Sequence, residues 1–381
     1  MAKIVSYQKG LKAAFAEARK QVKQPLFVAS SRRAIPMRHR ALGELFMGTA
    51  TPGLPTGCFI EIVGQMHAGK TSVTFAMIDA VVNQQRTEKT HRIQTSEGVE
   101  RIVPPNKVLF MDFEQAIDLN YLSNAGRNIE ILETDDQGRP CNIESANVFV
   151  HQPMTLEEGC DIMLHMIASQ EFGLVIMDSI AAMLSKEEAD KSMSENTMGK
   201  QARAIGMFLR KSAPMVNKYG VTVVLINQWR DKIGVSFGDP RTTPGGKAPG
   251  YYDAIKLDIM GPNKTPWFEE GKTVKIKSMK NKITGKKGEV LYHLETGFGI
   301  SAEVELTEMA MAAGLITNTS HKRAVRLKVK NGTKDYPNMR AWIDALRSNE
   351  KLFGTVASYC AKRGITSANN IKTDGNWGDE D

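Results

Sequence analysis

The sequence predicts an α/β fold around a central, mostly parallel β-sheet. Short apolar runs alternate with helical segments along most of the chain. The earlier runs are short and apolar rather than alternating, as expected of strands that are covered on both faces. A glycine-rich loop also joins the first run directly to a helix. The predicted strands are residues 59–63, 108–112, 147–150, 174–177, 221–226, 254–259 and 273–279.

Helices are predicted between these strands, and the pattern changes towards both ends of the chain. Three clear helical segments are residues 72–82, 155–170 and 197–219. We expect an N-terminal helix with a linker, an α/β core, a small C-terminal α/β domain and an acidic, disordered tail. Their residues are, in that order, 1–35, 36–300, 301–370 and 371–381.

The C-terminal domain is expected to combine helices with one basic strand. In residues 321–330, cationic and apolar residues alternate, which predicts a strand with one basic face. That face fits a collecting site for duplex DNA, and an ordinary solvated surface is the alternative. The helices are predicted at residues 306–313, 339–348 and 352–363.

The composition fits a cytoplasmic protein with a large core. Hydrophobic residues make up 41% of the 381 residues, and no apolar run approaches the ~18 residues of a membrane span. The net charge of +8 permits a polyanionic partner without requiring one. No CxxC pair or metal-ligand spacing is present, so we expect no structural zinc. The cysteines, expected to be small buried residues, are Cys58, Cys141, Cys160 and Cys360.

A phosphate-binding loop is the clearest motif. The segment Gly64-Gln-Met-His-Ala-Gly69-Lys70-Thr71 matches G-x-x-x-x-G-K-[ST] and lies between a predicted strand and a predicted helix. The glycines let backbone N–H groups point at phosphate oxygens. Lys70 would contact the β- and γ-phosphates, and the Thr71 hydroxyl would coordinate Mg²⁺. A tight structural turn is the alternative. The candidate nucleotide-binding residues are Gly64, Gln65, Met66, His67, Ala68, Gly69, Lys70, Thr71 and Ser72.

Two carboxylates follow predicted strands of the same sheet. Asp178 ends the apolar run 174–177, at the edge where open α/β sheets bind ligands, and would supply a second Mg²⁺ contact. Glu114 follows the strand at 108–112 and would orient or deprotonate the attacking water. An ordinary strand end and an ordinary surface carboxylate are the respective alternatives.

A long segment after the strand at 221–226 has neither a helical nor a strand period. Residues 226–247 mix cations, aromatic residues and glycines. Cations suit phosphates, and Trp229 and Phe237 suit bases or backbone packing, as in proteins that bind single-stranded nucleic acid. A flexible surface loop is the alternative.

Residues 64–71, 110–126, 175–182 and 226–259 closely resemble the RecA family of homologous recombinases. Within the last segment, Ile226-Asn-Gln, Lys232-Ile-Gly-Val, Phe237-Gly, Thr242-Thr and Gly245-Gly246 are similar to the second DNA-binding loop of that family. The resemblance covers roughly residues 50 to 300, with a looser match in the C-terminal part. Helicases and transport ATPases of the same core fold lack this loop.

The resemblance implies roles for individual residues. Tyr121 matches the aromatic residue that stacks on adenine, with Asp118 beside it in the nucleotide site. Gln228 matches the residue that senses the γ-phosphate, and Glu114 matches the carboxylate that activates water. Lys280 and Lys282 match cations that reach the ATP of the neighbouring protomer. The implied DNA-binding residues are Met198, Gly199, Arg203, Arg210, Trp229, Arg230, Lys232, Ile233, Phe237, Arg241, Gly245, Gly246 and Lys247.

The resemblance further implies a function. The expected activity is ATP-dependent, Mg²⁺-dependent strand exchange, in which a helical filament on single-stranded DNA pairs with homologous duplex DNA. The N-terminal helix would contact the next protomer, and single-strand-binding and loading proteins are candidate partners. The expected location is the cytoplasm of a bacterium or a phage-infected cell. The alternatives are a hexameric helicase motor of the same core fold and a non-catalytic recombination mediator.

The sequence also departs from the family pattern. The interior of the phosphate-binding loop is Gln-Met-His-Ala, which puts nucleotide affinity in question. Pro249 and Gly250 are expected to alter the helix that follows the second DNA loop. Two insertions, residues 85–104 and 128–146, are unusual, and the first is expected to form a hairpin.

Overall fold

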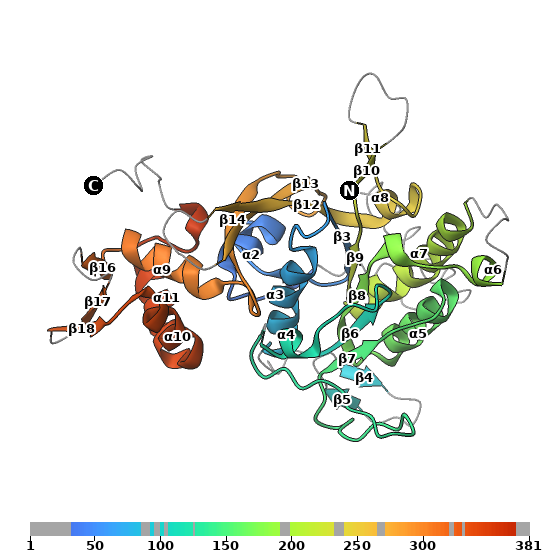
Figure 1. Cartoon of the computed structure of the whole chain (residues 1–381), viewed down its shortest axis with the longest axis horizontal. Coiled ribbons are helices and arrows are strands. Elements are labelled where there is room, and N and C mark those ends of the chain that lie inside the picture. The colour runs from blue at the N-terminus through green and yellow to red at the C-terminus, as the bar shows by residue number, and fades with distance from the viewer. Residues whose placement is uncertain are drawn as a thin grey trace, which may run out of the picture. The chain divides into compact units, whose positions relative to one another are not determined.

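The structure of the protein is a computed structural model, and Figure 1 shows its elements. All elements described below belong to one compact unit that begins at Ala34. The predicted N-terminal helix and acidic tail lie outside the described residues. The structure describes residues 32–84, 92–94, 100–102, 106–124, 126–190, 199–231, 240–264, 271–319, 324–329 and 332–370.

The central sheet confirms the predicted α/β fold. Among the described residues it has nine strands, in the order β15-β14-β13-β12-β3-β9-β8-β6-β7. The strands from β12 to β7 in that order are parallel, whereas β13, β14 and β15 extend the sheet antiparallel. The strands are β3 (Cys58–Gly64), β6 (Lys107–Asp112), β7 (Val148–His151), β8 (Phe172–Asp178), β9 (Thr222–Ile226), β12 (Asp253–Lys264), β13 (Lys272–Asn281), β14 (Glu289–Glu295) and β15 (Gly299–Ile300).

Helices cover both faces of the parallel part of this sheet, which explains why its central strands, β6, β8 and β9, are mostly apolar. Ile60 and Ile62 of β3 pack in one cluster with α2 (Arg40–Met47) and α3 (Lys70–Val82). Phe59 of the same strand faces the other side and packs with α5 (Leu156–Ser169) and α7 (Lys200–Tyr219). All seven residues of β3 and of β8 are buried. The sheet is therefore the middle layer of the core, as the strand pattern predicted.

Helix α2 is an element that the sequence analysis did not predict. It lies directly after a basic run and has no side-chain N-cap, so the usual start signal is missing. Instead, backbone N–H groups of its first turn donate to side chains that are distant in the sequence. The N–H of Ala41 donates to the Glu305 carboxylate at 2.7 Å, and the N–H of Leu42 donates to the Tyr292 hydroxyl at 3.0 Å.

The C-terminal residues have a hydrophobic cluster of their own, centred on the fully buried Trp342. The predicted basic strand is confirmed as β17, in which Val325 and Leu327 are buried while Arg326 and Lys328 are exposed. The elements are α9 (Ala302–Ala312), β16 (Ile316–Thr319), β17 (Ala324–Val329), β18 (Gly332–Tyr336), α10 (Met339–Ser348), α11 (Glu350–Lys362) and η2 (Ala368–Asn370).

The two insertions differ in structure. In the first, β4 (Arg92–Gln94) pairs antiparallel with β5 (Glu100–Ile102), which confirms the predicted hairpin. The second has only isolated bridges among its described residues. It carries Cys141, which is exposed, so the prediction that every cysteine is buried was wrong at this position. The reason is its place in an insertion outside the three hydrophobic clusters that bury Cys58, Cys160 and Cys360.

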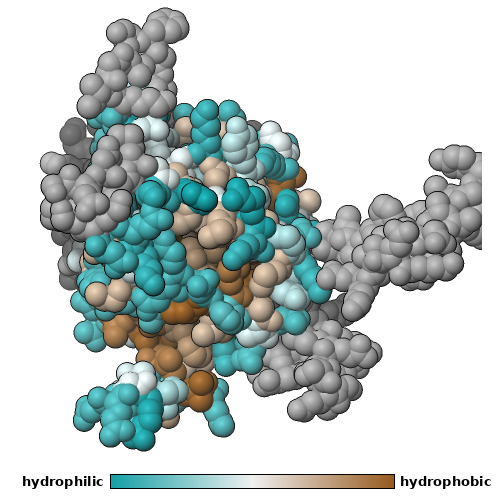
Figure 2. All heavy atoms as spheres, turned by 90° about the vertical axis from the view of Figure 1, so that its right-hand side faces the viewer, coloured by the Kyte–Doolittle hydropathy of each residue, from teal (hydrophilic) through white to brown (hydrophobic). Residues whose placement is uncertain are grey.

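The face that carries α5, α6 (Lys186–Ala189) and α7 is largely hydrophilic, with hydrophobic residues gathered in one area (Figure 2). Large apolar side chains are exposed at Met154, Leu184 and Met207, on these helices or just before them. None of the helices in the described ranges is both long enough and apolar enough for a membrane span.

Candidate nucleotide site and the adjoining loop

The phosphate-binding loop connects the end of β3 to the start of α3. Gly64 has no room for a side chain, because an added Cβ would lie 2.6 Å from the Ile259 carbonyl oxygen of β12. His67 and Gly69 have positive φ angles of 57° and 90°, which turn the loop into the helix. The five residues between strand and helix, 65–69, thus form a tight backbone curve beside the N-terminus of α3.

Lys70 lies inside this curve. Its side-chain ammonium donates to the carbonyl oxygen of Gln65 at 2.7 Å, so its partner is a neutral backbone group of the loop itself. Burial lowers the pKa of Lys70 below its usual value, whereas the nearby carboxylates of Asp178 and Glu114 act in the opposite direction. Arg230 is a further cation near enough to lower this pKa.

Thr71 and Asp178 form a pair that fits a magnesium ion. The Thr71 hydroxyl donates to Oδ2 of Asp178 at 2.7 Å. Burial raises the pKa of Asp178 to about 7, the Thr71 hydrogen bond opposes this shift, and the carboxylates of Glu114 and Asp112 add to it. A hydroxyl and a carboxylate are hard oxygen ligands, and Mg²⁺ at phosphate sites takes few protein ligands and fills the rest with water and phosphate.

Glu114 is held by two donors from neighbouring strand ends. The Ser179 hydroxyl and the Gln228 side-chain amide both donate to Oε1 of Glu114, the amide at 3.2 Å. The carboxylate is exposed, so water can reach it. The sequence analysis did not name Ser179, although its place directly after Asp178 at a strand end was an available signal.

Tyr121 contacts the first part of α3, directly after the phosphate-binding loop. The Tyr121 hydroxyl is 2.8 Å from the hydroxyl of Ser72, and its ring meets Phe75 edge-on with centroids 5.0 Å apart. Asp118 accepts from the backbone N–H groups of Asn120 and Tyr121, at the start of α4 (Leu119–Asn124). Asp118 thus orients the short helix that carries Tyr121.

The long loop begins and ends beside the nucleotide site. Its first strand, β10 (Arg230–Asp231), pairs antiparallel with its last, β11 (Arg241–Thr242). The N–H of Trp229 donates to the Gly64 carbonyl oxygen at 3.4 Å, so the loop starts on the phosphate-binding loop. Near the other end of the loop, the Pro244 carbonyl oxygen accepts a hydrogen bond from the side-chain amide of Asn227 at 3.0 Å.

The remaining candidate DNA residues fall into two groups. Gly199, Arg203 and Arg210 lie at or on α7, and both arginines are exposed. Gly245 and Gly246 have positive φ angles at the end of the long loop, followed by the exposed Lys247. Outside the described residues lie Met198, Lys232, Ile233 and Phe237.

Lys280 and Lys282 contact α8 (Ala248–Tyr252) and the residue after it. Lys280 donates to the Gly250 carbonyl oxygen at 2.6 Å and pairs with Asp253. Lys282 donates to the Tyr251 carbonyl oxygen at 2.9 Å. Helix α8 is only five residues long and has a proline in its first turn, in line with the expected effect of Pro249 and Gly250.

Comparison with known proteins identifies the family. The model of the RecA N-terminal domain matches residues 11–301. Protein RecA of Mycoplasma mobile is 31% identical over 299 residues, which cover 77% of this chain and 80% of that protein. Protein RecA of Mycobacteroides abscessus is 32% identical over 298 residues, covering 78% and 73%. For Protein RecA of Lactococcus lactis subsp. cremoris (strain MG1363) the identity is 33% over 273 residues, and the match spans only 60% of that protein's length. The chain belongs to the RecA family.

Proposed function

We propose that this protein is an ATP-dependent DNA strand-exchange recombinase. It forms helical filaments on single-stranded DNA, pairs that DNA with a homologous duplex, and hydrolyses ATP as a DNA-dependent ATPase. One observation supports this proposal most strongly. Gln228 bonds to Glu114 in the candidate hydrolytic site, and the next residue, Trp229, begins the long loop on Gly64. A loop anchored in this way is suited to respond to the occupant of the nucleotide site.

The chain supplies a residue for each part of ATP hydrolysis. Lys70 would exchange its Gln65 carbonyl for phosphate oxygens, which are stronger acceptors because they are charged. Thr71 and Asp178 would hold Mg²⁺, which neutralises charge on the phosphates. Glu114, held by Ser179 and Gln228, would orient the attacking water and take its proton.

The remaining residues supply binding surfaces in this proposal. Tyr121 packs on adenine, and Lys280 and Lys282 of one protomer complete the ATP site of the next, which makes hydrolysis depend on filament assembly. The cations on α7, together with Arg230, Lys232 and Lys247 of the long loop, hold the DNA backbone. The hydrophobic cluster around Trp342 supports the division into a core, residues 36–300, and a small DNA-gathering domain, residues 301–370.

Joint-molecule formation tests the proposal. The protein, ATP and Mg²⁺ are mixed with single-stranded DNA and a supercoiled duplex that is either homologous or unrelated. We expect joints only with the homologous duplex, and none with the Lys70→Ala variant. Lys351→Ala, which removes an exposed lysine on α11, is the matched control and should form joints normally. Strand separation regardless of homology would indicate a helicase motor, and DNA binding without either activity would indicate a mediator.

A further inference from the structure

Both ends of the long loop meet on one buried carboxylate. The Trp229 indole N–H donates to Oδ1 of Asp258 at 2.8 Å, and the Arg241 guanidinium lies 3.2 Å from Oδ2. Trp229 precedes β10, Arg241 begins β11, and Asp258 lies on β12 of the central sheet. We call these three residues the loop clamp. The Asp258 carboxylate thus bridges two chain segments that are separated by eleven residues of loop.

The clamp residues also contact each other directly. The Arg241 guanidinium carbon lies 4.5 Å from the centre of the Trp229 ring, a distance at which a cation is attracted to an aromatic face. The Lys256 ammonium lies 5.2 Å from the same ring and pairs with the buried Glu61 carboxylate at 2.8 Å. Trp229 is therefore held by two cations and by a hydrogen bond to the sheet.

The clamp is linked to the candidate nucleotide site through the backbone. Trp229 bonds through its N–H to Gly64 of the phosphate-binding loop. Gln228, the residue before it, bonds to Glu114 and receives its own backbone orientation from Asn227. A change at the phosphates that moves Gln228 must therefore move Trp229, and Trp229 cannot move without disturbing Arg241 across the loop.

We propose that Trp229 and Arg241 are positioning residues, and that the clamp on Asp258 transmits the state of the nucleotide site to both ends of the long loop. In this arrangement the two side chains act on DNA through the position of the loop, and direct phosphate contacts are made by other residues. The proposal rests on the proposed function only where it concerns stimulation of ATP hydrolysis by DNA.

Substitution of Asp258 isolates the clamp. Asp258 is 2% exposed, so it cannot contact DNA itself. An effect of its substitution on DNA binding or on DNA-stimulated hydrolysis must therefore pass through its neighbours. Asp258→Asn keeps the size of the side chain and removes the charge that holds Arg241. The Arg241 side chain is 38% exposed, so it can turn to solvent, and the variant is expected to fold. Thermal unfolding checks this, with Glu289→Gln, an exposed carboxylate on β14, as the matched control.

The first measurement is ATP hydrolysis with and without single-stranded DNA. We expect Asp258→Asn to lower the DNA-stimulated rate about tenfold and to leave the rate without DNA unchanged. The double variant Asp258→Asn, Arg241→Gln should have the same DNA-stimulated rate of ATP hydrolysis as Arg241→Gln alone, because both substitutions break the same unit. The slope of log Kd for single-stranded DNA against log salt concentration should be the same in Arg241→Gln as in the wild type. In Arg241→Gln, a salt slope that is smaller in magnitude by about 0.7 would show a direct phosphate contact. Together with losses of DNA-stimulated rate that multiply in the double variant, it would overturn the proposal.

The second measurement needs no DNA. Emission from Trp229 is obtained as the difference between the wild type and Trp229→Phe, with and without a nonhydrolysable ATP analogue whose binding is measured separately. We expect the bound analogue to shift this emission in the wild type and to shift it less in Asp258→Asn, where Trp229 no longer moves against the charged pair of Asp258 and Arg241. A bound analogue that leaves the emission unchanged overturns the clamp. A shift without DNA-stimulated hydrolysis in the wild type would leave the clamp standing and reject the proposed function.

Discussion

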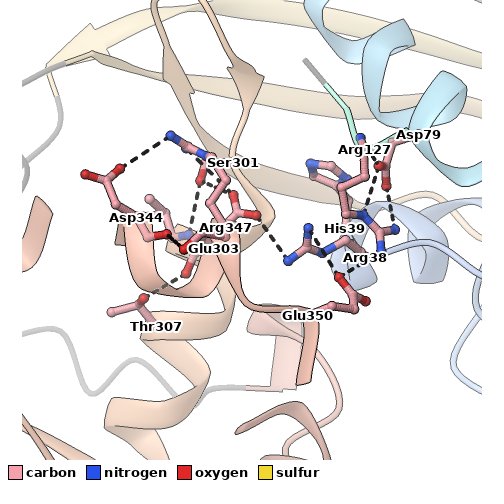
Figure 3. A network of polar contacts seen from close by, with 12 residues as sticks. Arg38, His39, Asp79, Arg127, Ser301, Glu303, Thr307, Asp344, Arg347 and Glu350 are labelled. Atoms are coloured by element: carbon pink, nitrogen blue, oxygen red, sulfur yellow. Dashed lines mark hydrogen bonds and ion pairs between the residues drawn. The ribbon is translucent and has the colours of Figure 1, made fainter. Parts of the chain in front are cut away.

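The nucleotide site and the junction between the core and the C-terminal residues both collect buried charges, but they pair them differently. In the nucleotide site, the Lys70 ammonium bonds to a neutral carbonyl oxygen of Gln65. At the junction, Arg38 lies between the carboxylates of Glu303 and Glu350 (Figure 3), at 3.3 and 3.9 Å. The first cation would gain by exchanging its partner for a phosphate, as the proposed function requires, whereas the second already has opposite charges beside it.

The same difference extends across the junction. Arg127 pairs with Asp79 of α3 at 3.1 Å and with Glu350 of α11 at 2.8 Å (Figure 3). Arg347 of α10 pairs with Glu295 of β14 at 2.6 Å. These arginines connect secondary-structure elements, and each is neutralised within the chain. The lesson is that the partner of a buried cation, more than the cation itself, separates a ligand site from a structural network.

Loss of the Lys70 charge should have the largest effect. We expect Lys70→Ala to lower ATP hydrolysis by a factor on the order of 100 or more, because no other described residue takes its place inside the loop. Hydrolysis and nucleotide affinity are measured together, with Lys351→Ala as the control. Near-normal hydrolysis in Lys70→Ala would show that Lys70 does not bind the phosphates, and the difference drawn between the nucleotide site and the junction would fail.

Glu114→Gln should separate binding from turnover. The amide keeps the size of the side chain but cannot accept a proton, so kcat should fall by roughly 100-fold or more while the affinity for ATP is retained. Single-turnover hydrolysis and equilibrium nucleotide binding measure the two quantities. Glu144→Gln, an exposed carboxylate of the second insertion, should change neither. A normal kcat in Glu114→Gln would assign the water-activating role elsewhere.

Arg127→Leu should test the structural character of the junction. Asp79 is 3% exposed and would be left without its charge partner, which is expected to cost about 3 kcal/mol of unfolding free energy. Urea unfolding measures this change. Arg326→Gln, which breaks an exposed ion pair with Asp335, should have no measurable effect. Nucleotide affinity should survive in Arg127→Leu, and its loss at unchanged stability would contradict the comparison.

The smallest expected effect is a pH dependence at the same junction. Burial raises the pKa of Glu305 to about 7, and its hydrogen bonds to Tyr292 and to the N–H of Ala41 oppose the shift. Burial and the Glu305 charge likewise raise the pKa of Glu308 to about 7. The folded state therefore binds more protons than the unfolded state between the usual carboxyl pKa and about 7, so stability falls as the pH rises through that window.

Glu305→Gln removes the Glu305 contribution to this dependence. The difference in Tm between the variant and the wild type should shift in favour of the variant between pH 5 and pH 8, a range of about three units around the raised pKa. Glu289→Gln should show a constant difference from the wild type over the same range. A constant difference in Glu305→Gln as well would show that burial does not perturb this carboxyl group.

Local patterns account for what could be predicted from the sequence. A strand buried on both faces needs a continuous apolar run, so β3, β6 and β8 were visible without a partner strand. The loop at residues 64–71 combines glycines, a lysine and a threonine at the spacing that is typical of phosphate-binding loops. The antiparallel strands β14 and β15 and the helix α2 were not predicted, because their signals are weak or lie in distant residues.

By itself, the sequence determined the fold class and the family and predicted the phosphate-binding loop, because each is encoded by residues that are close together along the chain. Only the tertiary structure decided which polar groups are paired. It placed the Ser179 hydroxyl on Glu114, joined Trp229 and Arg241 on Asp258, and left Lys70 on a neutral carbonyl. Such pairings depend on strand order and register, which bring distant residues into hydrogen-bond distance: Ser179 and Glu114 are 65 positions apart, and Gln228 and Glu114 are 114 positions apart. Hydrogen bonds and ion pairs act over a few ångströms in space, so spacing along the chain cannot specify them.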